Sequence, residues 1–351
     1  MTKDIFILTL AFLSGAMLFV GIRYFPGERW QVIVSLPVKK DENNLWKGIN
    51  FTYYGLLIAC AQTIALSVFI VLMGSVGVSL LNAVLFIAIL IGFCIPAAKI
   101  FARIIEKKMH TFTVGGASFF GMIIAPATVL IVNRSLAVPG DPIMVMLPFL
   151  TAAAISYAFG EGLGRLACIS FGCCYGKPVK GAGPFMERLF ERCSFTFSGK
   201  TKKIAYEAGL DGHKVIPVQA MTSVLFVMTG IISVYLFLSA HYTVAYGLAM
   251  LVTQGWRFVS ETMRADFRGK GRFSMYQIMA LLSCLYASLL AAFLPEQGEM
   301  GAPDVSNGLR YLWSPGVIIS IQALWAAMFV YFGRSRVTGS TLSIFVHHKN
   351  T

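Results

Sequence analysis

Residues 51–74 read FTYYGLLIACAQTIALSVFIVLMG, and residues 78–100 read VSLLNAVLFIAILIGFCIPAAKI. About 20 apolar residues cross the hydrocarbon layer of a bilayer as one helix, so each stretch predicts a membrane span. The same pattern recurs along the chain and predicts an all-α polytopic membrane protein of about nine helices, with a central cavity that is open to lipid. The predicted spans are 4–24, 51–74, 78–100, 113–133, 142–160, 217–239, 243–262, 275–294 and 311–333.

The composition supports this class. Of the 351 residues, 57% are hydrophobic and 13% are charged, whereas a soluble domain carries about 25% charged residues. A soluble globular protein is therefore excluded. The net charge of +13 favours anionic partners, which for a membrane protein are lipid headgroups before nucleic acid. The seven cysteines show no paired CxxC pattern and no nucleotide-binding loop is visible, so we expect neither a metal nor a cofactor.

The basic residues are unevenly divided between the two membrane sides. Alternating spans place 26 of the 29 Lys and Arg residues on the side opposite the N-terminus. The positive-inside rule assigns that side to the cytoplasm. Alternatively, some of these residues bind anionic headgroups and do not report topology. The sequence leaves the orientation open.

The chain divides into three predicted parts. Residues 1–50 form an extra N-terminal helix and a polar loop, and residues 51–295 form the membrane core. Residues 296–351 form an extra C-terminal helix and a basic tail. A polar stretch over 161–216 interrupts the core, and a loop of this length is usually functional or disordered.

The first candidate site opens this polar stretch. Residues 161–178 read EGLGRLACISFGCCYGKP and combine glycines, two basic residues and three cysteines. Glycine permits close approach of a ligand to the backbone, and Arg165 offers a planar fork that suits phosphate. Lys177 and Arg165 would also favour a reactive thiolate at Cys173 or Cys174. The alternative interpretation is a Gly-rich turn that only packs.

Two further groups of residues extend the candidate site. Arg257, Glu261 and Arg264 are spaced to share one face at the end of a predicted helix. Charges at membrane depth usually face the protein interior, although a purely structural ladder of ion pairs would have the same spacing. Tyr54 lies at the start of the second span, where an aromatic residue at the membrane interface is ordinary.

These motifs together resemble the prolipoprotein diacylglyceryl transferase family. The family signature G-R-[IL]-G-N-F-x-N-G-E-x-[WY]-G aligns without a gap, and shorter motifs follow in the family's order over about residues 50–295. The matching residues are Gly164, Arg165, Gly172, Tyr175 and Gly176 in the signature, Arg257, Phe258, Glu261 and Arg264 in R-F-x-x-E-x-x-R, Ser274, Met275 and Gln277 in S-M-x-Q, Tyr54, Gly55 and Leu56 in Y-G-L, Gly115, Gly116, Ser118 and Phe119 in G-G-x-S-F, and Pro217 and Gln219 in P-x-Q.

The sequence also departs from the family pattern. Phe120 stands where the resemblance implies a catalytic His, and Lys99 stands where an Arg is expected. The two Asn and the Glu of the signature are Cys168, Phe171 and Cys173 here. Phe cannot transfer a proton, so the family's acid–base chemistry cannot run through that position.

The resemblance implies a transferase in the bacterial cytoplasmic membrane. It would take diacylglyceryl from an anionic, phosphatidylglycerol-like donor and pass it to a thiol or hydroxyl acceptor that the sequence does not identify. The alternatives are a phospholipid-binding protein without catalysis, or transfer to an acceptor other than a lipoprotein. The family's active face looks outward, against the charge count. The predicted catalytic residues are Arg165, Arg257 and Glu261, and the predicted substrate-binding residues are Tyr54, Lys99, Gly116, Ser118, Glu161, Gly172, Cys173, Tyr175, Gly176, Arg264 and Gln277.

Overall fold

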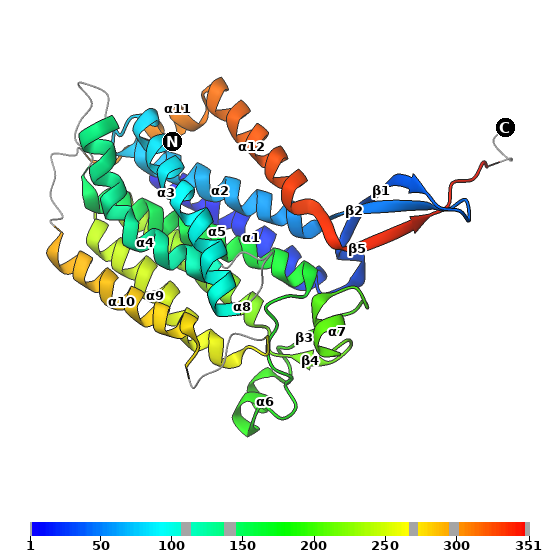
Figure 1. Ribbon diagram of the computed structural model, residues 1–351. Helices are drawn as coiled ribbons and strands as arrows, with labels where there is room; N and C mark the ends of the chain where they lie inside the picture. Colours follow the sequence, from blue (N-terminus) through cyan, green and yellow to red (C-terminus); the bar gives the residue numbers. More distant parts are fainter. Residues whose placement is uncertain (1, 107–113, 137–144, 267–272, 295–301, 348–351) are drawn as a thin grey trace.

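A computed structural model describes residues 2–106, 114–136, 145–266, 273–294 and 302–347. The described chain is mostly helical, and its long helices form one bundle with small β-structures at one end (Figure 1). The long helices are α1 (Lys3–Tyr24), α2 (Tyr53–Ser75), α3 (Leu80–Phe101), α4 (Val114–Ile131), α5 (Met146–Phe171), α8 (Val218–Phe237), α9 (Tyr242–Met263), α10 (Met275–Phe293) and α12 (Pro315–Gly333). The short helices are α6 (Pro184–Phe190), α7 (Lys203–Ala208) and α11 (Val305–Leu312).

The predicted fold class is confirmed. Eight of the described helices are long and apolar enough to cross a membrane. The predicted span at 243–262 corresponds to α9, which packs against α5, α8 and α10 within the bundle (Figure 1). It is less apolar than the other eight because Gln254, Arg257 and Glu261 lie along it. These polar groups face protein partners, as membrane-embedded charges generally do.

Helix α5 is the centre of the bundle. It contacts α1, α2, α4, α8 and α9, and 83% of its most apolar window is buried. It continues to Phe171, whereas the predicted span ends at residue 160. The glycines that suggested a loop instead allow close packing. A Cβ atom at Gly162 would lie 3.0 Å from Cβ of Phe226 on α8, and one at Gly160 would lie 3.2 Å from Cβ of Ala65 on α2. Small residues at such contacts let membrane helices approach closely.

The two ends of the chain meet in a three-stranded antiparallel sheet that the sequence analysis did not predict. Strands β1 (Val32–Lys40), β2 (Trp46–Thr52) and β5 (Arg334–Leu342) pair in the order β1-β2-β5. The register places Trp46 opposite Leu342 and Ile49 opposite Gly339. The predicted polar loop and basic tail are therefore partly strand, because tertiary pairing across about 290 residues supplies hydrogen bonds that local sequence does not reveal.

The same pairing attaches the C-terminal helix to the core. Thr52 Oγ1 donates a hydrogen bond of 3.1 Å to the carbonyl of Gly333. A Cβ atom at Gly55 would lie 2.1 Å from the backbone of Gly333, so only glycine permits this approach of α2 to the end of α12. The C-terminal helices α11 and α12 thus pack on α2, whereas the N-terminal helix α1 packs on α5 and α8.

The segment between α5 and α8 lies at the same end of the bundle as the three-stranded sheet (Figure 1). It contains α6, α7 and a two-stranded sheet of β3 (Phe195–Thr196) and β4 (Lys214–Val215). Lys202 attaches this segment to the ends of α1 and α5. Its fully buried ammonium donates hydrogen bonds to the carbonyls of Ser170 at 2.7 Å and Phe25 at 3.1 Å. Burial lowers the pKa of Lys202 to about 8.

Replacing this lysine gives a pH-dependent test of the fold. We expect Lys202→Met to lower the free energy of unfolding by about 1–3 kcal/mol, because two buried carbonyls lose their donor. Since the folded pKa lies below the ordinary value of about 10.4, the unfolded state binds more protons between these two pKa values. The free energy of unfolding of the wild type therefore rises relative to that of the variant as the pH increases from 8 to 10.

Thermal unfolding in detergent at pH 7, 8, 9 and 10 measures this difference. The matched control is Lys200→Met, which removes an exposed lysine two residues away. Equal midpoints for Lys202→Met and Lys200→Met across this pH range would contradict the structural role of Lys202.

Candidate functional site

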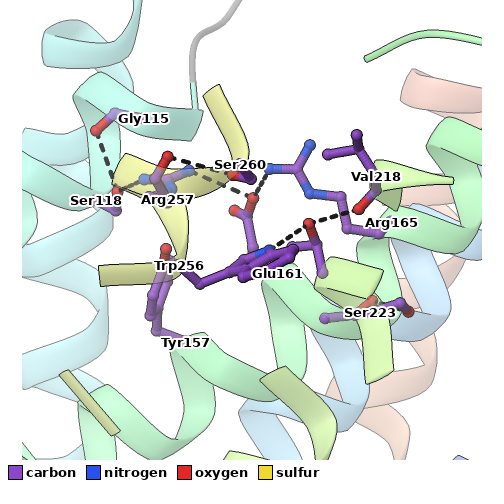
Figure 2. Close-up of polar contacts among 12 residues, drawn as sticks. Gly115, Ser118, Tyr157, Glu161, Arg165, Val218, Ser223, Trp256, Arg257 and Ser260 are labelled. Carbon is purple, nitrogen blue, oxygen red and sulfur yellow. Dashed lines mark hydrogen bonds and ion pairs between the residues drawn. The ribbon is translucent and has the colours of Figure 1, made fainter. Parts of the chain in front are cut away.

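The centre of the candidate site is a carboxylate that binds two arginines. Glu161 and Arg165 lie one turn apart on α5 and form an ion pair through Glu161 Oε1. Arg257, from α9, reaches the same oxygen with Nη2 at 3.3 Å. The side chains are 3%, 13% and 14% exposed in the order Glu161, Arg165, Arg257. Figure 2 shows both guanidinium groups converging on Glu161.

Helix α4 positions the second arginine. Arg257 Nη1 donates to Ser118 Oγ at 2.5 Å, and Ser118 in turn donates to the carbonyl of Gly115 at 3.1 Å. The Tyr157 ring of α5 lies 5.9 Å from the Arg257 guanidinium carbon, which is within the range of a cation–π interaction. Arg257 is therefore held from three sides by α4 and α5 (Figure 2).

Two polar atoms of this cluster have no protein partner among the described residues. They are Nε of Arg165 and Oε2 of Glu161, and both are buried. Buried polar groups are nearly always hydrogen-bonded, so these atoms indicate that a polar ligand or water belongs here. The cluster holds two guanidinium groups against one carboxylate, which leaves an excess of one positive charge for an anion to balance.

Helix α8 is hydrogen-bonded to both helices that carry the cluster, α5 and α9, and it lines a groove beside Trp256. Trp256 Nε1 donates to Thr222 Oγ1 at 2.8 Å, and Ser223 Oγ donates to the carbonyl of Gly162 at 2.5 Å. The adjacent groove measures about 430 Å³ and is almost entirely apolar. Its lining residues are Ala220, Met221, Val224, Leu225, Met228 and Trp256. An apolar groove next to a cationic cluster suits a lipid with an anionic headgroup.

The third arginine forms a separate cluster at the end of α9. Arg264 makes two hydrogen bonds of 2.7 Å to Asp266 and an ion pair of 3.6 Å with Glu261. Its backbone bridges to Gly176, where a Cβ atom would lie 2.2 Å from the carbonyl oxygen of Ile216. Arg264 is 5% exposed on its side chain. It therefore ties the turn after α5 to α9 and is neutralised by two carboxylates.

Three cysteines lie between these clusters. The Sγ atoms of Cys168, Cys173 and Cys174 all lie within 4.8 Å of one another. Hydrogen bonds with the thiols of Cys168 and Cys173 lower the pKa of Cys174 well below its ordinary value, and the charge of Arg264 acts in the same direction. Tyr54 lies at the start of α2, and its ring lies 5.6 Å from that of Phe171 in an edge-on contact.

Several other predicted site residues have structural contacts. Gln277 completes a capping box with Ser274 at the start of α10 and donates to the carbonyl of Phe258 at 3.2 Å. Gly116 lets α4 pack against Phe101 of α3. Gly172 ends α5 in the left-handed conformation, with φ of 73°. The Tyr175 hydroxyl donates to Glu207 at 3.1 Å, and Lys99 lies exposed near the end of α3.

The structure changes which acid is central. The spacing of Arg257, Glu261 and Arg264 predicts that Glu261 contacts both arginines. Glu261 does pair with Arg264, but Arg257 binds Glu161 on another helix. The i, i+4 spacing of Glu161 and Arg165 was the available signal for the observed pair, and it was hidden because residue 161 was assigned to a loop. The catalytic roles of Arg165, Arg257 and Glu261 remain predictions.

Comparison with known proteins gives one family. Residues 44–293 match the family described as prolipoprotein diacylglyceryl transferase. No curated protein and no solved structure matches the chain significantly. The matched range covers more than two thirds of the 351 residues and includes every cluster described above.

Removing the shared carboxylate tests the geometry of the site. Glu161→Ala leaves two nearly buried arginines without their counter-ion, and breaking such a pair costs about 3–5 kcal/mol. We therefore expect a lower thermal midpoint in detergent, whereas Glu42→Ala, which removes an exposed acid from the β1–β2 turn, should leave it unchanged. An unchanged midpoint for Glu161→Ala would show that the two arginines do not depend on this carboxylate.

Proposed function

Because the chain belongs to the prolipoprotein diacylglyceryl transferase family, we propose that it transfers diacylglyceryl from an anionic glycerophospholipid to a thiol acceptor. The donor would resemble phosphatidylglycerol, and the membrane would be the bacterial cytoplasmic membrane. The observation that carries the proposal is the Arg165–Glu161–Arg257 cluster, which is nearly buried and has one excess positive charge. A phosphodiester carries one negative charge and would balance it.

The unpartnered atoms indicate how the donor would bind. Arg165 Nε is buried without a protein partner, and a guanidinium group forms paired, charge-assisted hydrogen bonds with phosphate oxygens. Arg257 lies across the shared carboxylate and would contact the same phosphate. The acyl chains would occupy the apolar groove that α8 and Trp256 line, next in the chain to Arg257. Headgroup and tails would thus have separate, adjacent sites.

The same charges suit the chemistry of transfer. An acceptor thiolate would attack the glycerol carbon that carries the phosphate, forming a carbon–sulfur bond and breaking the carbon–oxygen bond. The phosphate would leave with the headgroup and gain one negative charge as it does so. Fixed guanidinium groups stabilise a charge that develops in the transition state, and loss of one such donor typically costs ~10²–10³ in rate.

A non-catalytic lipid-binding protein is the second candidate. The observation that favours it is Phe120, which occupies the position where the family resemblance implies a His. This alternative requires the donor lipid to bind at the arginine cluster without any release of its headgroup.

Arginine substitutions separate these two candidates. In proteoliposomes that contain phosphatidylglycerol and a cysteine-containing lipobox peptide, we expect wild-type protein to release glycerol phosphate and to add diacylglyceryl mass to the peptide. Arg165→Ala and Arg257→Ala should each lower the rate at least ~10²-fold, as for other donors to a developing anion. Arg192→Ala, which removes an exposed arginine in the same polar segment, should retain activity.

Lipid binding by wild-type protein with no release of glycerol phosphate would overturn transfer and support the non-catalytic role. Equal rates with a zwitterionic donor in place of phosphatidylglycerol would overturn the anionic donor.

A secreted lipoprotein acceptor would require the site to face outward. Cys193 lies exposed at this end of the molecule, so it reports the orientation without an engineered cysteine. We expect a membrane-impermeant maleimide to label Cys193 in intact cells, with Cys193→Ser as the control for background labelling. Labelling only after lysis would place the site in the cytoplasm, in agreement with the positive-inside rule, and would exclude secreted acceptors.

A further inference from the structure

The turn after α5 gathers three thiols into one small volume. Cys168 lies on the last turn of α5, and the chain reverses at Gly172, whose φ is 73°. The amide of Gly172 donates to the carbonyl of Cys168 at 2.9 Å, and the amide of Cys173 donates to the same carbonyl at 3.1 Å. Cys174 also has a positive φ, of 56°. These features bring the three Sγ atoms within 4.8 Å of one another.

The turn is fixed by its neighbours, so this grouping does not depend on the cysteines alone. Gln219 Nε2 donates to the carbonyl of Cys173 at 2.9 Å, and Ile204 N donates to the carbonyl of Gly172 at 3.0 Å. A Cβ atom at Gly172 would lie 3.1 Å from Lys202. Hydrogen bonds to the carbonyls of Gly172 and Cys173 therefore hold the turn that carries the three cysteines in place.

Three sulfur donors at this spacing form a recognised type of metal site. Thiolates are soft ligands that bind zinc, and catalytic zinc has three protein ligands with a fourth position open to water or substrate. Tetrahedral zinc with bonds of about 2.3 Å places its sulfur ligands roughly 3.8 Å apart. The observed cluster needs only a small contraction to reach that geometry.

We propose that Cys168, Cys173 and Cys174 bind one divalent ion of the zinc class and leave its fourth position for the thiol of the acceptor. The first half of this proposal rests on the cysteine geometry alone. The second half rests on the proposed transferase function.

The position of the cluster supports a role in transfer. Cys168 lies three residues after Arg165, so both are on one face of α5. A thiol bound to a metal ion is deprotonated, and the thiolate is the nucleophilic form. The cysteine cluster would thus supply the thiolate that Phe120 cannot generate by removing a proton.

The reaction balances without an oxidant or reductant. The acceptor thiol would lose its proton to solvent on binding the metal, and its sulfur would then attack the glycerol carbon of the donor. The carbon–oxygen bond to phosphate breaks with its electron pair on oxygen, and the leaving headgroup phosphate carries the added charge beside Arg165. The product thioether is a weaker ligand than a thiolate and leaves the fourth position.

Zinc binding is measured first, on the full-length chain in detergent without donor lipid. After reduction and chelation, zinc chloride is added and metal content is determined by mass spectrometry. We expect about one zinc per chain, and at least ~10-fold weaker binding in Cys168→Ser, Cys173→Ser and Cys174→Ser, since even outer-shell changes cost ~10–100-fold. Cys193→Ser, at an exposed cysteine outside the cluster, should bind zinc like wild type.

A second measurement uses wild-type protein, so it does not depend on the folding of the variants. Zinc should protect Cys168, Cys173 and Cys174 from alkylation, and peptide mapping identifies them among the seven cysteines. Cobalt in place of zinc should give thiolate charge-transfer absorption, which shifts when a lipobox peptide with a free thiol is added. A serine-substituted peptide is the control.

Absence of zinc binding by fully reduced wild-type protein would overturn the proposal, as would a disulfide within the cluster of protein isolated under anaerobic conditions. Zinc binding with an unchanged cobalt spectrum on adding peptide would overturn the open fourth position. If zinc-free protein transferred diacylglyceryl at the same rate as zinc-loaded protein, the catalytic role of the metal would be overturned. None of the binding measurements requires transfer, so failure of the transferase proposal would be recognised separately.

Discussion

A charge inside a bilayer needs a partner in the protein, and in this chain two arginines share one carboxylate oxygen. Glu161 on α5 binds Arg165 of its own helix and Arg257 of α9. Desolvation makes an unpaired ion very costly, so the three side chains are stable only together. The pairing therefore fixes how α5 and α9 meet, and Ser118 extends the same constraint to α4. The packing of three helices and the electrostatics of the site have a common cause.

This constraint explains why α5 is both the most buried helix and the longest one. Its C-terminal turns carry Glu161, Arg165 and Cys168, and these have to remain helical to keep their one-turn spacing. The glycines at 160 and 162 permit that extension because α2 and α8 approach at those positions. A larger side chain there would separate the helices that enclose the charged cluster. The glycines are thus required for helix packing rather than for loop flexibility.

The sequence predicted the features that depend on local pattern. Hydropathy located the spans, and motif spacing identified Arg165, Arg257 and Arg264. Contacts between distant segments were not predictable from local pattern. The β1-β2-β5 sheet pairs residues near 50 with residues near 340, and Glu161 pairs with Arg257 across helices. The sequence pointed to a reactive thiolate at Cys173 or Cys174 and to no metal, because the proximity of the three thiols depends on a left-handed turn at Gly172, which spacing alone does not encode.

The end of α5 also brings together the proposed phosphate site and the cysteine cluster. Arg165 and Cys168 are three residues apart, which is about 4.5 Å along a helix axis. In an attack on carbon, the nucleophile approaches to about 3–3.5 Å on the side opposite the leaving oxygen. With the length of the carbon–oxygen bond added, the attacking sulfur lies roughly 4.5–5 Å from the leaving oxygen. Arg165 and Cys168 share one face of α5, so a phosphate held at Arg165 and an acceptor thiolate at the cysteine cluster would lie on the same side of the helix, where the donor's glycerol carbon could be placed between them.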